Sequence, residues 1–89
     1  KGDEIDVVAV NEKSKEILFC ESKWRNRNVD WGIVEELEQK AQLVDWYNEV
    51  RKERFLIVSK SGFTRHCLER MHDEKILHWD VMDIKNIIK

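Results

Sequence analysis

Two carboxylates and one lysine near the start of the chain have the residue types and spacing of a metal-dependent site. Glu21 and Lys23 are two positions apart in a stretch that predicts a strand, so their side chains point to one face. Asp6 lies in the preceding β-branched stretch, and a polar turn brings it close to Glu21. Neighbouring carboxylates need a cation or proton between them, and Mg²⁺ (or Mn²⁺) is the usual ion with oxygen ligands. Lys23 is then placed to orient a water or to stabilise charge on a phosphate.

The spacing of an acidic residue two positions before a lysine is weak evidence by itself. It occurs four times in the chain: Glu21/Lys23, Glu38/Lys40, Asp73/Lys75 and Asp83/Lys85. Only the first pair falls in a predicted strand that follows a strand with another acidic residue. We interpret the other three pairs as solvated charge on helices or loops. The structural context therefore selects the pair that could take part in chemistry.

Basic and aromatic residues follow the second predicted strand directly. Arg25 and Arg27 could contact phosphates, and Trp24 offers a stacking face, which together predict nucleic-acid binding. A solvated loop is the alternative interpretation. The net charge of −2 argues against bulk attraction to nucleic acid, so any such role depends on a local patch. Gln39, on the following predicted helix, either supports the site or is simply a polar helix surface.

Hydrophobic periodicity predicts seven elements that would hold these residues in place. Alternating and β-branched stretches predict strands over residues 5–10, 17–24, 54–59 and 76–81. Apolar residues at helical spacing predict a helix over 33–52, with shorter helices over 64–71 and 82–89. The order is β-β-α-β-α-β-α. A hairpin followed by alternating helices and strands predicts an α/β fold with a mixed sheet flanked by helices.

Length and composition limit the class of protein. The 89 residues suit one domain, and 42% hydrophobic with 38% charged residues is typical of a globular domain with a charged surface. The sequence contains no apolar run of the roughly 18 residues that a membrane helix needs, so we expect no membrane partner. Cys20 and Cys67 are too few for a disulfide framework, which favours a cytoplasmic location.

Two segments together resemble the PD-(D/E)xK nuclease superfamily. They are Gly2-Asp3-Glu4-Ile5-Asp6-Val7-Val8 and Phe19-Cys20-Glu21-Ser22-Lys23-Trp24. Within the superfamily, the glutamate–x–lysine–tryptophan ending looks most like the uncharacterised nuclease-like domain found C-terminal to archaeal-type P-loop ATPases. Ile5 takes the place of the proline in the family's name. The motifs cover about the first quarter of the chain.

The resemblance implies a restriction-endonuclease-like fold and a Mg²⁺-dependent phosphodiesterase. It makes Asp6 and Glu21 the metal ligands and Lys23 the catalytic lysine. It also implies a further glutamate upstream of Lys1 and an ATPase domain elsewhere in the same protein, so we expect residues 1–89 to be a C-terminal piece. No Walker-type glycine loop occurs in these residues.

Two functions of different class remain open. One is a nuclease-like domain that cleaves DNA with Mg²⁺. The other is a catalytically inactive descendant, which binds nucleic acid or serves as a regulatory interaction module on an ATPase. A live enzyme needs all of its acidic ligands, whereas an interaction module needs an exposed apolar or aromatic patch.

Overall fold

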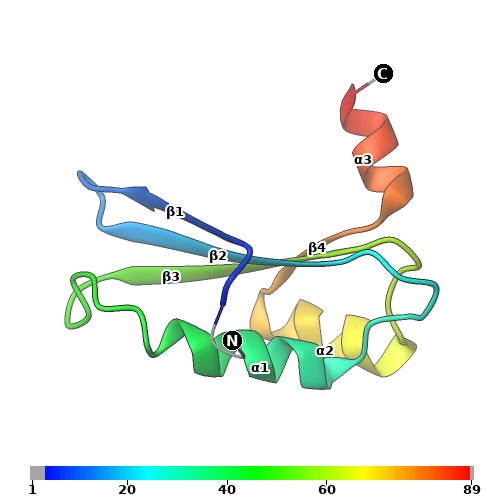
Figure 1. Ribbon diagram of the computed structural model, residues 1–89, viewed down its shortest axis with the longest axis horizontal. Helices are drawn as coiled ribbons and strands as arrows, with labels where there is room; N and C mark the ends of the chain where they lie inside the picture. Colours follow the sequence, from blue (N-terminus) through cyan, green and yellow to red (C-terminus); the bar gives the residue numbers. More distant parts are fainter. Residues whose placement is uncertain (1–3, 89) are drawn as a thin grey trace.

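The computed structural model describes residues 4–88, which form one four-stranded sheet and three helices (Figure 1). The predicted element order is confirmed. In chain order the elements are β1 (Val7–Asn11), β2 (Glu16–Lys23), α1 (Trp31–Ala41), β3 (Lys52–Ser59), α2 (Arg65–Glu74), β4 (Leu77–Trp79) and α3 (Val81–Ile88). Gly2 and Asp3 of the first motif and Lys89 of the last predicted helix lie outside the described residues.

The sheet is mixed, in the strand order β1-β2-β3-β4. β1 and β2 are an antiparallel hairpin, whereas β2–β3 and β3–β4 are parallel pairs joined through α1 and α2. In the hairpin turn, the Asn11 side chain accepts hydrogen bonds from the amides of Lys13 and Ser14, and Lys15 has a positive φ of 59°. These contacts set a register in which Val7 pairs with Cys20 and Val10 with Ile17.

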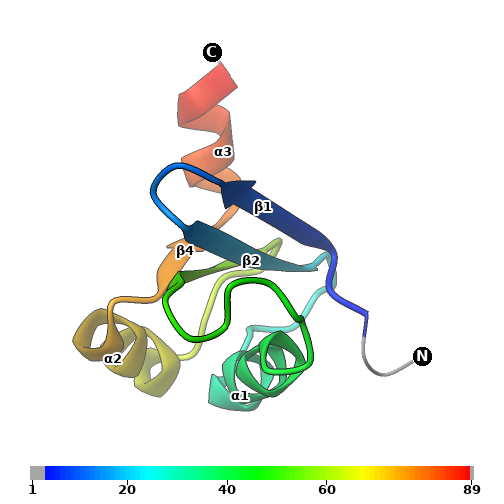
Figure 2. The same cartoon turned by 90° about the vertical axis from the view of Figure 1, so that its left-hand side faces the viewer.

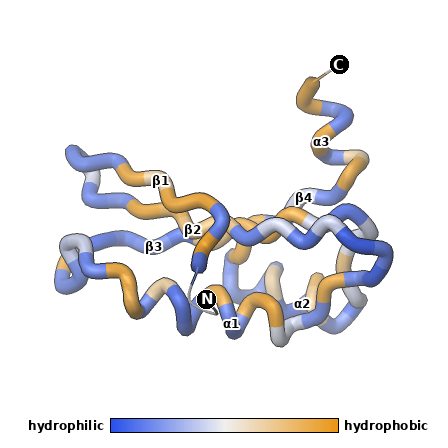
Figure 3. The backbone as a smooth tube through the Cα atoms, viewed as in Figure 1, coloured by the Kyte–Doolittle hydropathy of each residue, from blue (hydrophilic) through white to orange (hydrophobic). Residues whose placement is uncertain are grey.

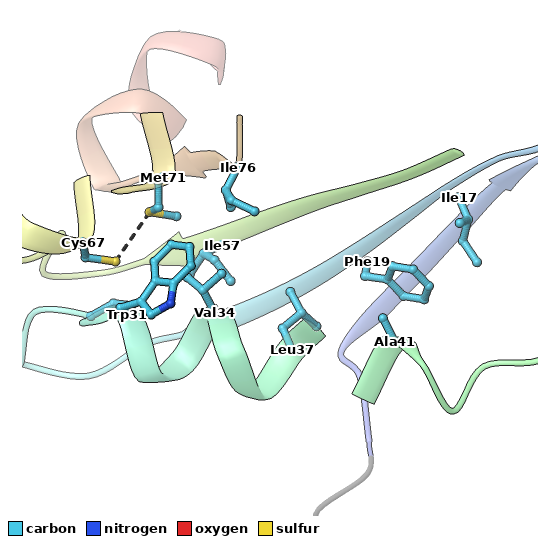
Figure 4. Packing of buried hydrophobic residues seen from close by; sticks show 11 residues of the cluster. Ile17, Phe19, Trp31, Val34, Leu37, Ala41, Ile57, Cys67, Met71 and Ile76 are labelled. Carbon is cyan, nitrogen blue, oxygen red and sulfur yellow. Dashed lines mark hydrogen bonds between the residues drawn. The ribbon is translucent and has the colours of Figure 1, made fainter. Parts of the chain in front are cut away.

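Helices α1 and α2 cover the same face of the sheet, and α3 projects from the opposite side (Figure 2). The core lies between the sheet and this helix pair, where Phe19, Ile57, Leu37 and Val34 are completely or almost completely buried. At the α2 end of the core, Cys67 Sγ lies 3.6 Å from Met71 Sδ (Figure 4). Burial raises the pKa of the Cys67 thiol to about 11, so it behaves as a small apolar side chain.

The opposite face of the sheet has much exposed apolar surface. Hydrophobic residues follow β1 and α3 (Figure 3). Val7 of β1 and Leu77 and Trp79 of β4 are exposed on this face, and no residue of α3 is buried. Among residues 4–88, no helix is long and apolar enough to cross a bilayer.

The predicted helix over residues 33–52 is wrong in its length. Helix α1 starts earlier, with Asp30 as N-cap, and ends at Ala41. Arg51 provides the physical reason: its guanidinium donates to the backbone carbonyls of Ala41, Val44 and Trp46. These bonds satisfy carbonyls that a longer helix would have used and fold residues 42–51 into a loop.

Other boundaries differ from prediction by a few residues. β1 starts at Val7, two residues later than predicted, because the chain bends at Asp6, whose side chain and not its backbone binds β2. Thr64 caps α2 as predicted, since its hydroxyl accepts the Cys67 amide hydrogen, but the helix continues to Glu74. β4 is shortened to Leu77–Trp79. None of these shifts changes the predicted fold class.

We expect Leu37→Ala to destabilise the fold by about 2–5 kcal/mol, because Leu37 is 1% exposed and its removal leaves a cavity between α1 and the sheet. Urea denaturation of both proteins measures the change. Leu43→Ala is a matched control, since Leu43 is exposed and lies just beyond the same helix. An equal loss from the two substitutions would contradict the assigned apolar face.

Candidate metal and phosphodiester site

The side of β2 that faces the helices changes from apolar to charged along its length. Ile17 and Phe19 are buried in the core, followed on the same face by Glu21 and then Lys23. This is the face predicted from strand alternation. Glu21 is only 7% exposed, which makes it one of two buried polar or charged residues in the described chain. A carboxylate at this depth is costly unless charged or polar groups surround it.

Two lysines approach the Glu21 carboxylate, one on each oxygen. Lys23 Nζ lies 3.3 Å from Oε2, and Lys40 Nζ lies 3.9 Å from Oε1. The second distance is too long for a hydrogen bond. Oε1 is thus buried and has no hydrogen-bond partner among the described residues. The ammonium groups offset the charge of Glu21 but leave one of its oxygens without a direct ligand.

Lys40 was missed by the sequence analysis, which assigned the Glu38/Lys40 pair to solvated charge. Lys40 lies in the last turn of α1, three residues after the buried Leu37, and its side chain is 18% exposed. Residues three apart lie on neighbouring parts of a helix surface. Lys40 therefore flanks the apolar stripe and points toward β2. The three-residue spacing from Leu37 was the available signal.

Asp6 lies one residue before β1, so the prediction that it belongs to that strand is wrong by this margin. The β1–β2 register, continued by one position, puts Asp6 across from Glu21. Its Oδ2 accepts a 2.8 Å hydrogen bond from the Ser22 amide. The side chain thus binds the edge of β2 just before the first residue of β1. The Asp6 side chain is exposed, which leaves its other oxygen accessible to solvent.

The thiol of Cys20 is affected by both carboxylates. Burial raises the pKa of Cys20, and the charges of Asp6 and Glu21 raise it further. The thiol is therefore protonated at neutral pH and is a poor nucleophile. The shared effect also indicates that Asp6 and Glu21 act on one region of β2.

The predicted nucleic-acid-binding residues follow β2 in a loop over residues 24–30. Trp24 is 60% exposed. Arg25 and Arg27 line an open pocket of about 710 Å³, together with polar residues of the same loop and the first turn of α1. The loop is tied to the end of β3, since Ser61 Oγ donates to the Arg25 carbonyl and Lys60 Nζ donates to the Asn26 side chain.

The N-termini of α1 and α2 meet at this pocket. Thr64 Oγ1 donates a 2.7 Å hydrogen bond to Asp30 Oδ1, which also accepts the Trp31 amide hydrogen. Both bonds stabilise the ionised carboxylate and lower the pKa of Asp30, and the bond from Thr64 has the larger effect. Both helix dipoles have their positive ends here, which favours negatively charged groups, whereas the carboxylates of Asp30 and Glu36 also line the pocket and oppose them.

Gln39, the predicted supporting residue, is exposed on α1. Its supporting role stays a prediction. Within residues 4–88, no three His, Cys, Asp or Glu side chains lie together in a group that could hold a metal ion. A cation at β2 would therefore have Asp6 and Glu21 as its only His, Cys, Asp or Glu ligands among the described residues.

Comparison with known proteins gives one match. The family model for archaeal and bacterial proteins of unknown function, DUF234, matches residues 1–41. These residues include β1, β2 and α1, and thus Asp6, Glu21, Lys23 and Lys40. No curated protein and no solved structure matches the chain. The match relates the N-terminal part of the chain to that family and assigns it no activity.

A second charged cluster lies between α1, β3 and α2 and shows the effect of like charges. Burial raises the pKa of Glu38, and the negative charge of Glu74 raises it further, while Arg70 opposes the shift. Glu38, Glu53 and Glu74 line the same pocket. Unlike Glu21, Glu38 forms no ion pair within the described part of the chain.

We expect Glu38→Gln to stabilise the protein at pH 7 and to have little effect well below the ordinary glutamate pKa of 4.5. A carboxyl with a raised folded-state pKa binds more protons when folded, so stability falls as pH rises through that window. Thermal unfolding at both pH values measures the difference, with Glu49→Gln as an exposed control. A stabilisation that is equal at both pH values would exclude the ionisation of Glu38 as its cause.

Proposed function

We propose that this chain is a nuclease-like domain in which Asp6 and Glu21 bind a divalent cation and Lys23 acts on a phosphodiester. The observation that carries the proposal is the Oε1 atom of Glu21, which is buried and without a hydrogen-bond partner among residues 4–88. A structural ion pair would be expected to satisfy both oxygens of a buried carboxylate. A buried oxygen without a hydrogen bond, on a residue across from a second acidic residue in the strand register, suits an ion ligand.

The donor set fits a hard cation that retains water. Mg²⁺ is commonly held by one or two carboxylates plus waters and substrate phosphates, so the absence of a three-ligand group in the described residues is compatible with it. Glu21 Oε1 and the solvent-accessible oxygen of Asp6 would hold the ion. When bound, the ion would polarise a phosphate oxygen and lower the pKa of a bound water.

Lys23 contributes charge and not coordination. Its ammonium lies 3.3 Å from Glu21 Oε2 and its side chain is 26% exposed, so it reaches both the buried carboxylate and solvent. A phosphate approaching from solvent would meet this ammonium first, and its negative charge would be stabilised there. The motif resemblance to the PD-(D/E)xK superfamily supports the same assignment.

The loop after β2 is the proposed contact for the rest of the nucleic acid. Arg25 is two residues beyond Lys23, which puts it within about 7 Å of chain from the end of the strand. Arg25 and Arg27 can contact phosphates at the pocket, and the exposed Trp24 can stack on a base. The contact is local, in keeping with the net charge of −2.

A second candidate is an interaction module, in the form of a regulatory domain that docks on an ATPase domain of the same protein. The uncovered sheet face and α3 favour it, since Met82, Ile87 and Ile88 are each more than 60% exposed. This candidate needs no metal. Cation binding at Asp6 and Glu21 therefore separates the two candidates.

In the intact protein, we expect Asp6→Asn and Glu21→Gln each to weaken Mn²⁺ binding by roughly tenfold or more, since even outer-shell partners of a metal are worth about that much. Lys23→Ala should retain binding and lower the rate of DNA cleavage, because lysine provides no oxygen ligand. Isothermal titration calorimetry with Mn²⁺ measures the first effect without knowledge of the substrate.

Asp6→Asn keeps an oxygen that can accept the Ser22 amide hydrogen, so its effect on the fold should be small. Glu49→Gln, at an exposed position, is the control for loss of one negative charge. Equally poor Mn²⁺ binding by the wild type and Asp6→Asn would refute the metal site, and the interaction module would then become the leading candidate.

Arg25→Gln and Arg27→Gln should each weaken binding of a single-stranded oligonucleotide and reduce the slope of log affinity against log salt by about one. Fluorescence anisotropy over a salt series measures both quantities. Lys85→Gln, on α3, removes the same charge at a distance from the pocket. If the three variants have the same slope, the loop over residues 24–30 is not the contact surface.

A further inference from the structure

Lys40 has a position that the proposed chemistry does not explain. It comes from α1, not from the motif strand, and it approaches Oε1 of Glu21, the oxygen that is buried without a hydrogen-bond partner among the described residues. Lys23 already pairs with the other oxygen at a shorter distance. A second lysine at 3.9 Å therefore adds charge near Oε1 without binding that atom directly.

We propose that Lys40 is a tethered counter-ion for Glu21. Its ammonium neutralises the Glu21 carboxylate while no divalent cation is bound, and it withdraws when a cation binds. The proposal rests on the proposed metal site and names its regulation. Lys40 lowers the cost of keeping Glu21 buried in the metal-free protein. It also competes with the cation, so metal affinity is set by how readily Lys40 leaves.

The charges around Glu21 cancel in the metal-free protein. Asp6 and Glu21 provide two negative groups, and Lys23 and Lys40 provide two positive groups. A bound divalent cation adds two positive charges in a partly buried place, where repulsion between like charges is screened less than in water. Withdrawal of one ammonium into solvent reduces that excess.

The Lys40 side chain is flexible enough for this movement, and another acidic residue is available to pair with it. Its side chain is 18% exposed, and lysine has a flexible four-carbon stem with a strongly hydrated head. Glu36 lies four residues before it on α1 and is exposed. A glutamate four residues N-terminal to a lysine is the favourable orientation for a helical ion pair. Lys23, in contrast, projects from a strand inside the sheet and has no such helical neighbour.

Lys40→Met in the intact protein tests the proposal, because the two expected effects have opposite signs. Metal-free protein should be destabilised, with a lower urea midpoint, since Glu21 loses one of its cations. Mn²⁺ binding should tighten by roughly tenfold. The free energy of a tenfold change is only a fraction of the interaction energy of two unit charges about 4 Å apart near a protein surface. If Lys40 had only a structural role, its substitution would lower stability without raising the affinity for Mn²⁺.

Three controls isolate the position and the charge. Lys40→Arg keeps the charge and should leave Mn²⁺ affinity within about twofold of the wild type. Lys13→Met removes the same charge from the distant hairpin turn, and Asn86→Met adds the same side chain at an exposed position of α3. Neither should change Mn²⁺ affinity. Unchanged or weaker binding by Lys40→Met, with the wild type binding normally, would overturn the proposal.

A double-mutant cycle separates this inference from the proposed function. The urea midpoints of Lys40→Met, Glu21→Gln and the double variant give the coupling between the two side chains without any metal. Additive effects would refute the counter-ion role even if the wild type binds Mn²⁺. Non-additive effects would support the ion pair between Lys40 and Glu21. If neither the wild type nor Lys40→Met then binds Mn²⁺, the competition between Lys40 and metal is overturned and the proposed nuclease site is refuted.

Discussion

A carboxylate buried on the apolar face of β2 is the constraint on which the arrangement around the site depends. Taking an ionised group out of water costs several kcal/mol, and proteins offset this cost with paired charges and hydrogen bonds. Glu21 has one lysine from its own strand and one from the helix packed above it. The packing of α1 on the sheet must therefore satisfy two demands: it covers Phe19 and Ile57, and it brings Lys40 over Glu21.

The ends of α1 fix where Lys40 lies. At the N-terminus, Asp30 joins the first turn of α1 to Thr64, the N-cap of α2, so that the N-termini of the two helices lie together. At the C-terminus, the Arg51 guanidinium binds the Ala41 carbonyl and is paired with Glu53 of β3. The helix is thus tied to the N-cap of α2 at one end and to β3 at the other. Lys40 is one residue from the second tie, and a change in helix length there would move it away from β2.

Those features of the site that follow from local periodicity could be predicted from the sequence. Alternation along β2 put Glu21 and Lys23 on one face, and the hairpin put Asp6 near them. The helix end could not be predicted, because the apolar spacing continues through Val44 and only the side chain of Arg51, ten residues after Ala41, shows where the carbonyls are satisfied.

The role of Lys40 depends on tertiary packing. Its acidic-x-lysine spacing is the same as that of the exposed Asp73/Lys75 pair, so this spacing does not indicate contact with β2. The position of Asp6 has a similar cause. Its β-branched neighbours favour a strand, but its carboxylate binds the Ser22 amide and takes the place of a backbone partner. In both cases a side-chain contact with a residue distant in sequence fixes the position of the residue and overrides its local propensity.

The acidic and basic parts of the site meet because parallel strands end on the same side of a sheet. β2 and β3 both end at this edge, with Lys23 paired to Ser59 and the Lys60 amide bound to the Lys23 carbonyl. Their following loops enter α1 and α2, so both helix N-termini lie there as well. In open α/β sheets, ligands bind outside the carboxyl ends of such strands. Glu21 and Arg25 are separated by at most about 14 Å of extended chain. A charged polymer lying along this edge could therefore meet the carboxylates and the arginines together, without a basic surface over the whole domain.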